Sequence, residues 1–350
     1  MKKQIFATGI FILSLIFPLK VSAQNNDDIY VFGDSLSDTG NVFNATGGII
    51  PPSPTYFNGR FSNGPIWVEY LASDLGLKLN LNNNFAYGGA TTGSKNIGLS
   101  SLPGLQQQIN SFTSANTSVN PNALYVIWAG TNDYLDYFFG NVPNPNETVN
   151  NLSMAVTSLA AVGAKNFLVV NLPDLGKFPV TGGNNQDYSL LSTFTNAHNS
   201  ILTANLNFLS QQLSPDINII PLDVNSLFNR IIAAPEEFGF TNVTDSCIGD
   251  LSVVSINLHK QLVACDPDNF LFWDQVHPTT AAQKLIAELA FSAVKPVPIS
   301  EPSAVLGMLA LGVLGTVGWA VDRYKDERKV RATIVLMPVF EVIDRQSPEF

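Results

Sequence analysis

The sequence predicts an α/β protein in which a mainly parallel sheet is covered by helices on both faces. Short apolar segments alternate along the chain with longer segments whose apolar residues recur at helical spacing. The short segments are apolar throughout, which is typical of strands buried on both faces of a parallel sheet. With 350 residues, of which 45% are apolar and 13% charged, the chain can bury a full core without a metal or a dense disulfide framework.

Four strands are predicted, and each ends at glycine, proline or polar turn residues. They are residues 28–32, 123–128, 167–170 and 217–220. A weaker strand is expected next to Asn84. Parallel sheets place their functional sites beyond the carboxyl ends of the strands, so the residues that follow each segment are candidates for chemistry.

Three helices are predicted from apolar residues at helical spacing. They are residues 147–164, 189–213 and 279–294. Three polar stretches are interpreted as long loops, at 41–64, 90–122 and 235–270. Loops of this length often cover functional sites.

The first 23 residues predict a signal peptide. Lys2 and Lys3 form a basic start, residues 5–17 are uncharged and mostly apolar, and residues 21–23 fit a small-residue cleavage site. A buried N-terminal helix is the alternative for this segment. The signal peptide predicts that residues 1–23 are removed and that the rest of the chain is exported.

A second apolar segment lies near the other end of the sequence. Residues 304–321 are 18 residues without a charge, and basic residues follow up to residue 331. As a helix this segment would span about 27 Å, close to the hydrocarbon thickness of a bilayer. A buried core helix is the alternative. We expect a folded body at 24–299, an apolar anchor or sorting segment at 300–331 with possible membrane association, and a tail without an assigned role at 332–350.

The body between these ends is strongly acidic. Residues 24–303 hold 9 Lys or Arg and 22 Asp or Glu, a net charge of −13. Nucleic acid binding needs clustered basic residues, so this charge argues against a nucleic acid partner. The whole chain has only two Cys and three His, too few for a zinc-ribbon array or a multi-histidine metal cage. We expect neither a metal nor another cofactor.

A candidate nucleophile follows the first predicted strand directly, in the segment Gly33-Asp34-Ser35-Leu36. A serine at this position stands at the carboxyl edge of the sheet, where a substrate can reach it. The same tetrapeptide is equally typical of a helix cap, so it indicates a catalytic site only together with a base.

A serine nucleophile needs a base, and the base needs an orienting carboxylate. His198 lies within a predicted helix and His259 in an irregular stretch. His277 follows Asp274 by three residues, so both side chains can come from one short turn, and Asp274 can fix the imidazole tautomer. A surface loop pair is the alternative reading of this spacing.

Acyl transfer also requires donors where negative charge develops. Asn132, in Gly130-Thr131-Asn132-Asp133, follows a predicted strand at the same sheet edge as Ser35 and could donate from its side chain. Gly88-Gly89 follows the weaker strand and could donate a backbone N–H. Each segment alone is also an ordinary turn.

Taken together, these segments resemble the four blocks of the GDSL family of SGNH hydrolases, in the family's order. The resemblance extends to Gly59-Arg60-Phe61-Ser62-Asn63-Gly64-Pro65-Ile66-Trp67, to 84–90 and to Leu172-Pro173-Asp174-Leu175-Gly176, and it covers about residues 28 to 294. It implies a doubly wound three-layer α/β/α fold with a mainly parallel central sheet, and ester hydrolysis without a metal.

By the family pattern, Ser35 is the nucleophile, His277 is the base and then the acid, and Asp274 orients His277. The resemblance also implies an oxyanion hole made of the backbone N–H groups of Ser35 and Gly89 and the side chain of Asn132. Whether Gly88 or Gly89 donates is a question of register, and we expect Gly89.

The function expected on this basis is an exported serine hydrolase that cleaves carboxylic esters as an esterase or lipase. An esterase of acetylated carbohydrate and a lipid acyltransferase with the same triad are the alternatives. A non-enzymatic surface module is a third, which would not need all four blocks. A small-molecule or lipid ester is the expected partner.

The C-terminal segment resembles a PEP-CTERM sorting segment, with Ser300-Glu301-Pro302-Ser303 ahead of the apolar stretch. It departs from that pattern because Ser300 stands where a proline is expected and because the chain continues beyond the basic residues. The resemblance implies a bacterial protein that is periplasmic, anchored at the cell surface or secreted, and a possible contact with sorting machinery. A plain membrane anchor is the alternative.

The two cysteines, Cys247 and Cys265, lie 18 positions apart in the last long loop. In an exported protein such a pair predicts a disulfide, which would contribute roughly 3 kcal/mol if unstrained. Two free buried thiols are the alternative.

Overall fold

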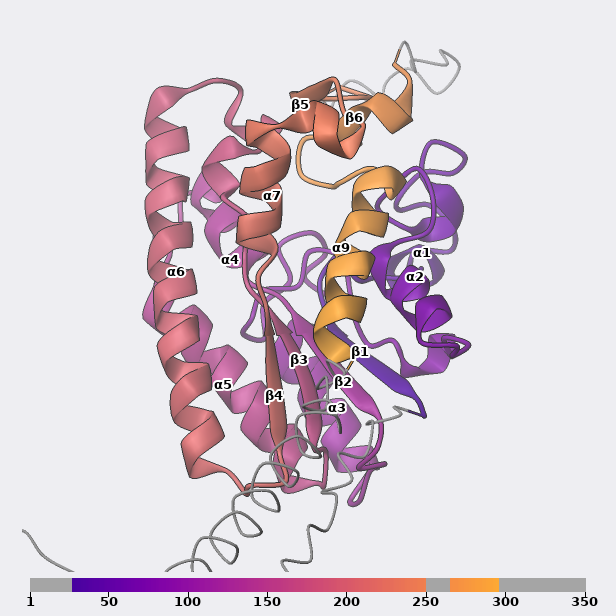
Figure 1. Cartoon of the computed structure of the whole chain (residues 1–350), viewed down its shortest axis with the longest axis vertical. Coiled ribbons are helices and arrows are strands. Elements are labelled where there is room, and N and C mark those ends of the chain that lie inside the picture. The colour runs from indigo at the N-terminus through magenta and orange to yellow at the C-terminus, as the bar shows by residue number, and fades with distance from the viewer. Residues whose placement is uncertain (1–26, 250–264, 296–350) are drawn as a thin grey trace, which may run out of the picture. The chain divides into compact units, whose positions relative to one another are not determined.

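A computed structural model describes residues 27–249 and 265–295 of the chain (Figure 1). The predicted signal peptide, the C-terminal segment at 300–331, the tail and His259 lie outside these residues. Among the helices of the described residues, none has both the length and the apolar character that crossing a bilayer requires.

A sheet of four parallel strands runs through the centre of the described structure, in the order β1-β2-β3-β4. Its strands are β1 (Ile29–Gly33), β2 (Leu124–Trp128), β3 (Asn166–Val170) and β4 (Asn218–Leu222). Every residue of β2 and β3 is buried, whereas most of β4 is not, because β4 is an edge strand. All four strands predicted from continuous apolar segments are confirmed.

The expected fifth strand next to Asn84 is not formed. Residues 84–87 instead run beside β1 with an isolated bridge between Asn84 and Val31. The N–H of Phe85 donates to the carbonyl of Val31 at 2.7 Å, and the N–H of Tyr87 donates to that of Gly33 at 3.1 Å. The next strand in the sequence, β2, lies on the other side of β1. The order in which segments are added to the sheet therefore reverses at β1, as in a doubly wound fold. Such switch points are where α/β sheets bind ligands.

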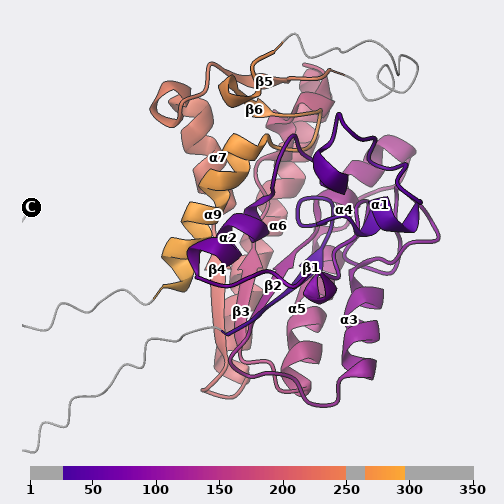
Figure 2. The same ribbon diagram turned by 90° about the vertical axis from the view of Figure 1, so that its right-hand side faces the viewer.

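Helices cover both faces of the sheet, and Figure 2 shows α2, α7 and α9 on one side and α3 and α5 on the other. The two layers take alternate side chains of the strands: Val126 and Leu168 face the first layer, and Tyr125 and Phe167 face the second. The six main helices are α2 (Trp67–Asp74), α3 (Leu105–Ala115), α5 (Pro145–Ala161), α6 (Asn185–Gln212), α7 (Val224–Ala233) and α9 (Thr280–Val294). The expected α/β/α fold class is confirmed.

The three predicted helices are confirmed as α5, α6 and α9, with ends shifted by a few residues. Asn144, Asn184 and Thr279 cap them, each side chain accepting a hydrogen bond from a backbone N–H of the first turn. These caps explain why α5 and α6 begin before their first apolar residue.

The stretches interpreted as long loops contain regular structure, so that interpretation is wrong in part. They hold α1 (Asn41–Ala45), α3 and β5 (Asn242–Ser246), and β5 pairs in parallel with β6 (Phe270–Phe272), which begins where the third stretch ends. Helix α4 (Thr131–Leu135) follows β2. In α3 only Leu105, Ile109 and Phe112 form the apolar stripe among polar residues, which makes the segment polar on average. The sequence of β5 is mostly polar, and none of its five residues is buried.

Candidate active site

Ser35 lies in a tight turn directly after β1. The side chain of Asp34 accepts a hydrogen bond from the N–H of Leu36 at 3.0 Å, and its carbonyl accepts one from Ser37 at 3.1 Å. Gly33 is required because a Cβ there would collide with the carbonyl of Trp128 on β2. These contacts fix the turn at the end of β1 and place the hydroxyl of Ser35 at the carboxyl edge of the sheet.

Asp274 and His277 come from one turn between β6 and α9. Asp274 Oδ1 accepts the N–H groups of Val276 and His277, both at 2.8 Å, and the N–H of Trp273 donates to the carbonyl of His277 at 2.7 Å. The turn therefore builds its own carboxylate–imidazole pair. The Asp-x-x-His spacing gives the local geometry that the sequence suggested.

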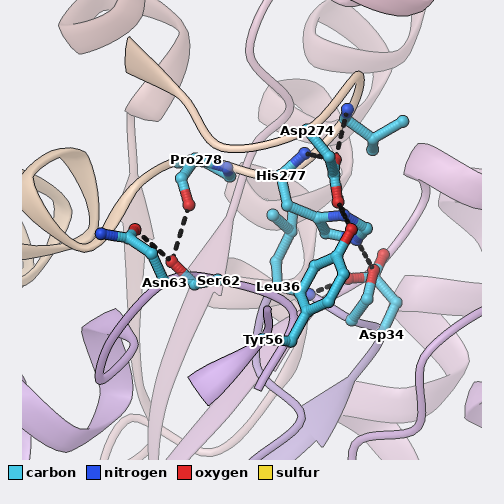
Figure 3. A network of polar contacts seen from close by, with 10 residues as sticks. Asp34, Leu36, Tyr56, Ser62, Asn63, Asp274, His277 and Pro278 are labelled. Atoms are coloured by element: carbon cyan, nitrogen blue, oxygen red, sulfur yellow. Dashed lines mark hydrogen bonds and ion pairs between the residues drawn. The ribbon is translucent and has the colours of Figure 1, made fainter. Parts of the chain in front are cut away.

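The structure brings Ser35, His277 and Asp274 together. His277 Nε2 lies 2.7 Å from Ser35 Oγ, and His277 Nδ1 lies 2.7 Å from Asp274 Oδ2. Ser35 and His277 are each 8% exposed and Asp274 is fully buried. Solvent therefore reaches the serine and the imidazole but not the carboxylate. Figure 3 shows the His277 ring beside the Asp274 carboxylate, with Tyr56 reaching the same carboxylate.

Asp274 is held in its ionised form. Burial alone would raise the pKa of Asp274, but the charge and hydrogen bond of His277, together with donors from Tyr56 and Val276, outweigh burial and hold that pKa below its usual range. An ionised carboxylate can stabilise a neighbouring imidazolium and fix its tautomer.

Gly88 and Gly89 differ in what their N–H groups contact. The Gly88 N–H donates to Asp38 Oδ2 at 3.0 Å. Among the described residues, the Gly89 N–H has no protein acceptor. Of the two groups, the Gly89 N–H is the one without an acceptor in this part of the chain.

The Gly88-Gly89 segment is held by Asn96. Asn96 Nδ2 donates to the carbonyl of Gly88 at 2.9 Å, and a Cβ on Gly89, which has φ +82°, would meet Asn96 Oδ1 at 2.5 Å. No motif in the sequence marks Asn96, because its role depends on a loop that returns to the glycine pair.

Asn132 is the second residue of α4 and is 7% exposed. Its amide donates one hydrogen bond, to the carbonyl of Ala90 at 2.9 Å, which leaves its second amide hydrogen without an acceptor among the described residues. Next to it, Asp133 accepts the N–H and the hydroxyl of Thr92 at 2.8 and 2.6 Å. The loop that carries Gly89 is thus tied to Asn132 on one side, and through Asp38 to the segment after Ser35 on the other.

The carboxyl group of Asp34 lies in an environment that disfavours its ionised form. It is fully buried, and its Oδ2 has no hydrogen-bond partner in the part of the chain that the structure describes. Burial raises the pKa of Asp34 to about 7, against the Leu36 N–H and the His277 charge, which lower it. Because the same carboxyl ionises near 3.8 in an unfolded chain, folding favours its protonated form.

Replacing Asp34 with asparagine should therefore flatten the pH dependence of stability. In the wild type, protonation of Asp34 contributes to the free energy of unfolding. This contribution is fully present below about pH 4 and is lost as the pH rises to about 7. Asp34→Asn keeps an acceptor for Leu36 and carries no charge, so its advantage over the wild type should grow by about 2 to 3 kcal/mol between pH 5 and pH 8. Urea unfolding at both pH values measures this difference, and an equal pH dependence in the two proteins would contradict it.

Cys247 and Cys265 form a disulfide with their Cα atoms 5.5 Å apart. The N–H of Cys247 donates to the carbonyl of Phe272 at 3.0 Å, and that of Ile248 donates to Trp273 at 3.0 Å. The disulfide therefore lies against the strand that leads into Asp274. The residues at 250–264, within the loop that it closes, are outside the described structure.

The chain matches known proteins over most of its length. A family model described as GDSL-like Lipase/Acylhydrolase matches residues 29–290. The chain is 34% identical over 273 residues to thermolabile hemolysin of Vibrio parahaemolyticus, which covers 74% of this chain and 62% of that protein. It is 30% identical over 304 residues to phosphatidylcholine-sterol acyltransferase of Aeromonas hydrophila, which covers 75% of this chain and 88% of that protein.

A plant relative is similar to a comparable degree. The chain is 30% identical over 335 residues to a GDSL esterase/lipase of Arabidopsis thaliana, with 76% of this chain and 85% of that protein covered. The span of the family match contains Ser35, Gly89, Asn132, Asp274 and His277. On this match and on the α/β fold that carries these residues, the chain belongs to the GDSL-like lipase/acylhydrolase family.

Proposed function

We propose that the chain hydrolyses carboxylic esters by acyl transfer through Ser35. Its family makes it a carboxylic ester hydrolase. The observation that carries the assignment of the nucleophile is the continuous series of contacts from Ser35 Oγ through His277 to Asp274, with 2.7 Å at both steps. A hydroxyl, an imidazole and a carboxylate in this order form the arrangement that activates a serine.

The reaction has two steps. His277 removes the proton of Ser35 while Oγ attacks the ester carbonyl, and Asp274 stabilises the imidazolium that forms. His277 then gives that proton to the departing alcohol, and an acyl group remains on Ser35. In the second step His277 takes a proton from water, the water oxygen attacks the acyl carbon, and the acid leaves as Ser35 regains its proton.

The negative oxygen of each tetrahedral intermediate needs donors that the folded chain does not already use. Three candidates meet this requirement: the N–H of Ser35, the N–H of Gly89 and the second amide hydrogen of Asn132, none of which has an acceptor among the described residues. Their positions are set before substrate arrives, because Asp38, Asn96 and Ala90 hold the loops that carry them. Such preorganised donors contribute most where charge develops.

Asn132→Ala should lower kcat by about 10²-fold to 10³-fold, as expected for the loss of one oxyanion donor. The substitution also removes the hydrogen bond to Ala90, so the melting temperature should be measured beside kcat. Asn82→Ala, at an exposed position in the segment before Asn84, is a suitable control and should leave kcat unchanged. A kcat of Asn132→Ala within a factor of three of the wild type would overturn the role of Asn132.

The ester itself is best identified with a series of p-nitrophenyl esters of increasing acyl length, together with acetylated polysaccharide. For an esterase or lipase we expect kcat/KM to change with acyl length and acetylated polysaccharide to be a poor substrate. The reverse result favours the carbohydrate esterase. A folded chain that turns over none of these esters would contradict the proposed function.

Acyl transfer to a second alcohol is the alternative that a specific relative favours. The similar protein of Aeromonas hydrophila is named a phosphatidylcholine-sterol acyltransferase. Adding a sterol to a phosphatidylcholine assay distinguishes the two reactions, because transfer yields a sterol ester where hydrolysis yields free fatty acid.

We also propose that the hydrolase domain spans residues 24–299 and is exported. The basic, apolar and small-residue parts of 1–23 support a cleaved signal peptide, and the apolar segment followed by basic residues supports an anchor or sorting role for 300–331. Fractionation of producing cells, with detection of both ends of the chain, tests this. Full-length chain in the cytoplasm would contradict export.

A further inference from the structure

Tyr56 contacts the candidate active site without belonging to any of its sequence motifs. Its hydroxyl donates to Asp274 Oδ2 at 2.7 Å, the same oxygen that lies closest to His277 Nδ1 (Figure 3). The other donors to Asp274, namely the N–H groups of Val276 and His277 and the His277 ring, all come from its own turn. Among the described residues, Tyr56 is the donor that reaches this carboxylate from elsewhere in the sequence, 218 positions away.

The ring of Tyr56 is held independently of its hydroxyl. It is 1% exposed and packs edge-on against Trp273 and Phe61, with ring centroids 6.5 and 6.3 Å apart. Phe61 in turn lies against the imidazole of His277, with ring centroids 5.1 Å apart. A phenylalanine at position 56 would keep this packing and lose only the hydrogen bond to Asp274.

The hydroxyl of Tyr56 remains a donor under working conditions. Burial, and then the negative charge and hydrogen bond of Asp274, raise the pKa of Tyr56 far above its usual range. The phenol is therefore protonated wherever the carboxylate is ionised, and its O–H points at a charged acceptor. Hydrogen bonds to a charged group in a buried site are stronger than neutral ones.

We propose that Tyr56 is a positioning residue for the hydrolytic reaction, acting on His277 through Asp274. The phenol holds the carboxylate in the rotamer that presents Oδ2 to Nδ1, and it ties the turn that carries Asp274 and His277 to the loop that follows the nucleophile segment. This inference rests on the role proposed above for Asp274. Within the described residues the Tyr56 hydroxyl hydrogen-bonds to Asp274 and neither to Ser35 nor to the His277 ring, so its effect must pass through the carboxylate.

Tyr56→Phe should lower kcat by about 10-fold to 100-fold, the range expected for one hydrogen bond to a buried charge. KM should stay unchanged, because Tyr56 is almost fully buried and its hydroxyl is bound to Asp274. Rates are expressed per Ser35 that reacts with a fluorophosphonate, so that any unfolded fraction does not count. Tyr70→Phe is the matched control, because it removes a hydroxyl that contacts Thr280 Oγ1 at 2.9 Å, away from Asp274, and it should keep the wild-type kcat.

A double-mutant cycle in the full-length chain tests whether the effect passes through Asp274. In an Asp274→Ala background, Tyr56→Phe should cause no further loss of kcat, because the acceptor is gone. In an Asn132→Ala background it should cause its full loss, because Asn132 acts on a different part of the transition state.

Each possible result decides the question. A Tyr56→Phe enzyme with wild-type kcat overturns the inference, and so does an equal loss in the Asp274→Ala background or in Tyr70→Phe. If Asp274→Ala itself is fully active, the proposed role of Asp274 fails instead, whatever Tyr56→Phe does. The failure of the inference is thereby distinguished from the failure of the proposed function.

Discussion

Ser35→Ala is expected to lower kcat for ester hydrolysis by about 10⁶-fold, as the loss of a serine nucleophile does in other triad enzymes. The side-chain hydroxyl of Ser35 makes one hydrogen bond in the described structure, with His277 Nε2, so its removal leaves the surrounding hydrogen bonds of the turn intact. The melting temperature should therefore stay close to that of the wild type. Activity on an aryl ester and thermal unfolding, measured on the same preparation, test both parts.

The matched control for this variant is Ser37→Ala. Ser37 lies in the same turn, is fully buried, and its Oγ accepts a hydrogen bond from the Trp67 indole at 3.2 Å. Loss of that bond should affect stability more than catalysis. If Ser35→Ala kept even a hundredth of the wild-type kcat, a different nucleophile would have to be sought.

Asp274→Asn is expected to lower kcat by about 10⁴-fold, the effect of the same change in a serine protease triad. The two oxygens of Asp274 accept hydrogen bonds from two backbone N–H groups, the Tyr56 phenol and the His277 ring. Asparagine has only one acceptor oxygen, which the two backbone donors require. Its NH₂ group would then face Nδ1 and favour the tautomer whose proton sits on Nε2, where it cannot accept the Ser35 proton.

Asp268→Asn serves as the control for this variant, because it changes the charge equally in the segment just before β6 without touching the site. Its kcat should match that of the wild type. If the wrong tautomer of His277 causes the loss, the fluorophosphonate reaction of Ser35 should slow in Asp274→Asn in parallel with kcat. A large loss of hydrolysis with normal fluorophosphonate reactivity would place the function of Asp274 outside nucleophile activation.

The strands of the central sheet could be predicted from the sequence because burial on both faces leaves a continuous apolar pattern, which β2 and β3 display in full. The segment at 84–87 could not, because it meets only one edge of β1 and forms an isolated bridge there. Helix α3 was missed for a related reason, since its buried stripe is narrow and polar residues surround it.

The residues of the candidate site also differ in whether the sequence alone predicts them. Ser35, Asp274 and His277 stand in short local motifs, and turn geometry alone relates Asp274 to His277. Tyr56 has no such motif, because its contact with Asp274 depends on how two loops meet across the fold. The choice of Gly89 over Gly88 as a donor stays a prediction, to which the structure adds that Asp38 accepts the Gly88 N–H.

If His277 activates Ser35 as the nucleophile, a fluorophosphonate should react with this serine in the full-length chain, and mass spectrometry locates the adduct. We predict a single adduct on the peptide that contains Ser35, and almost none in His277→Ala under the same conditions. An adduct on another residue, or an enzyme that hydrolyses esters while Ser35 stays unlabelled, would contradict this account.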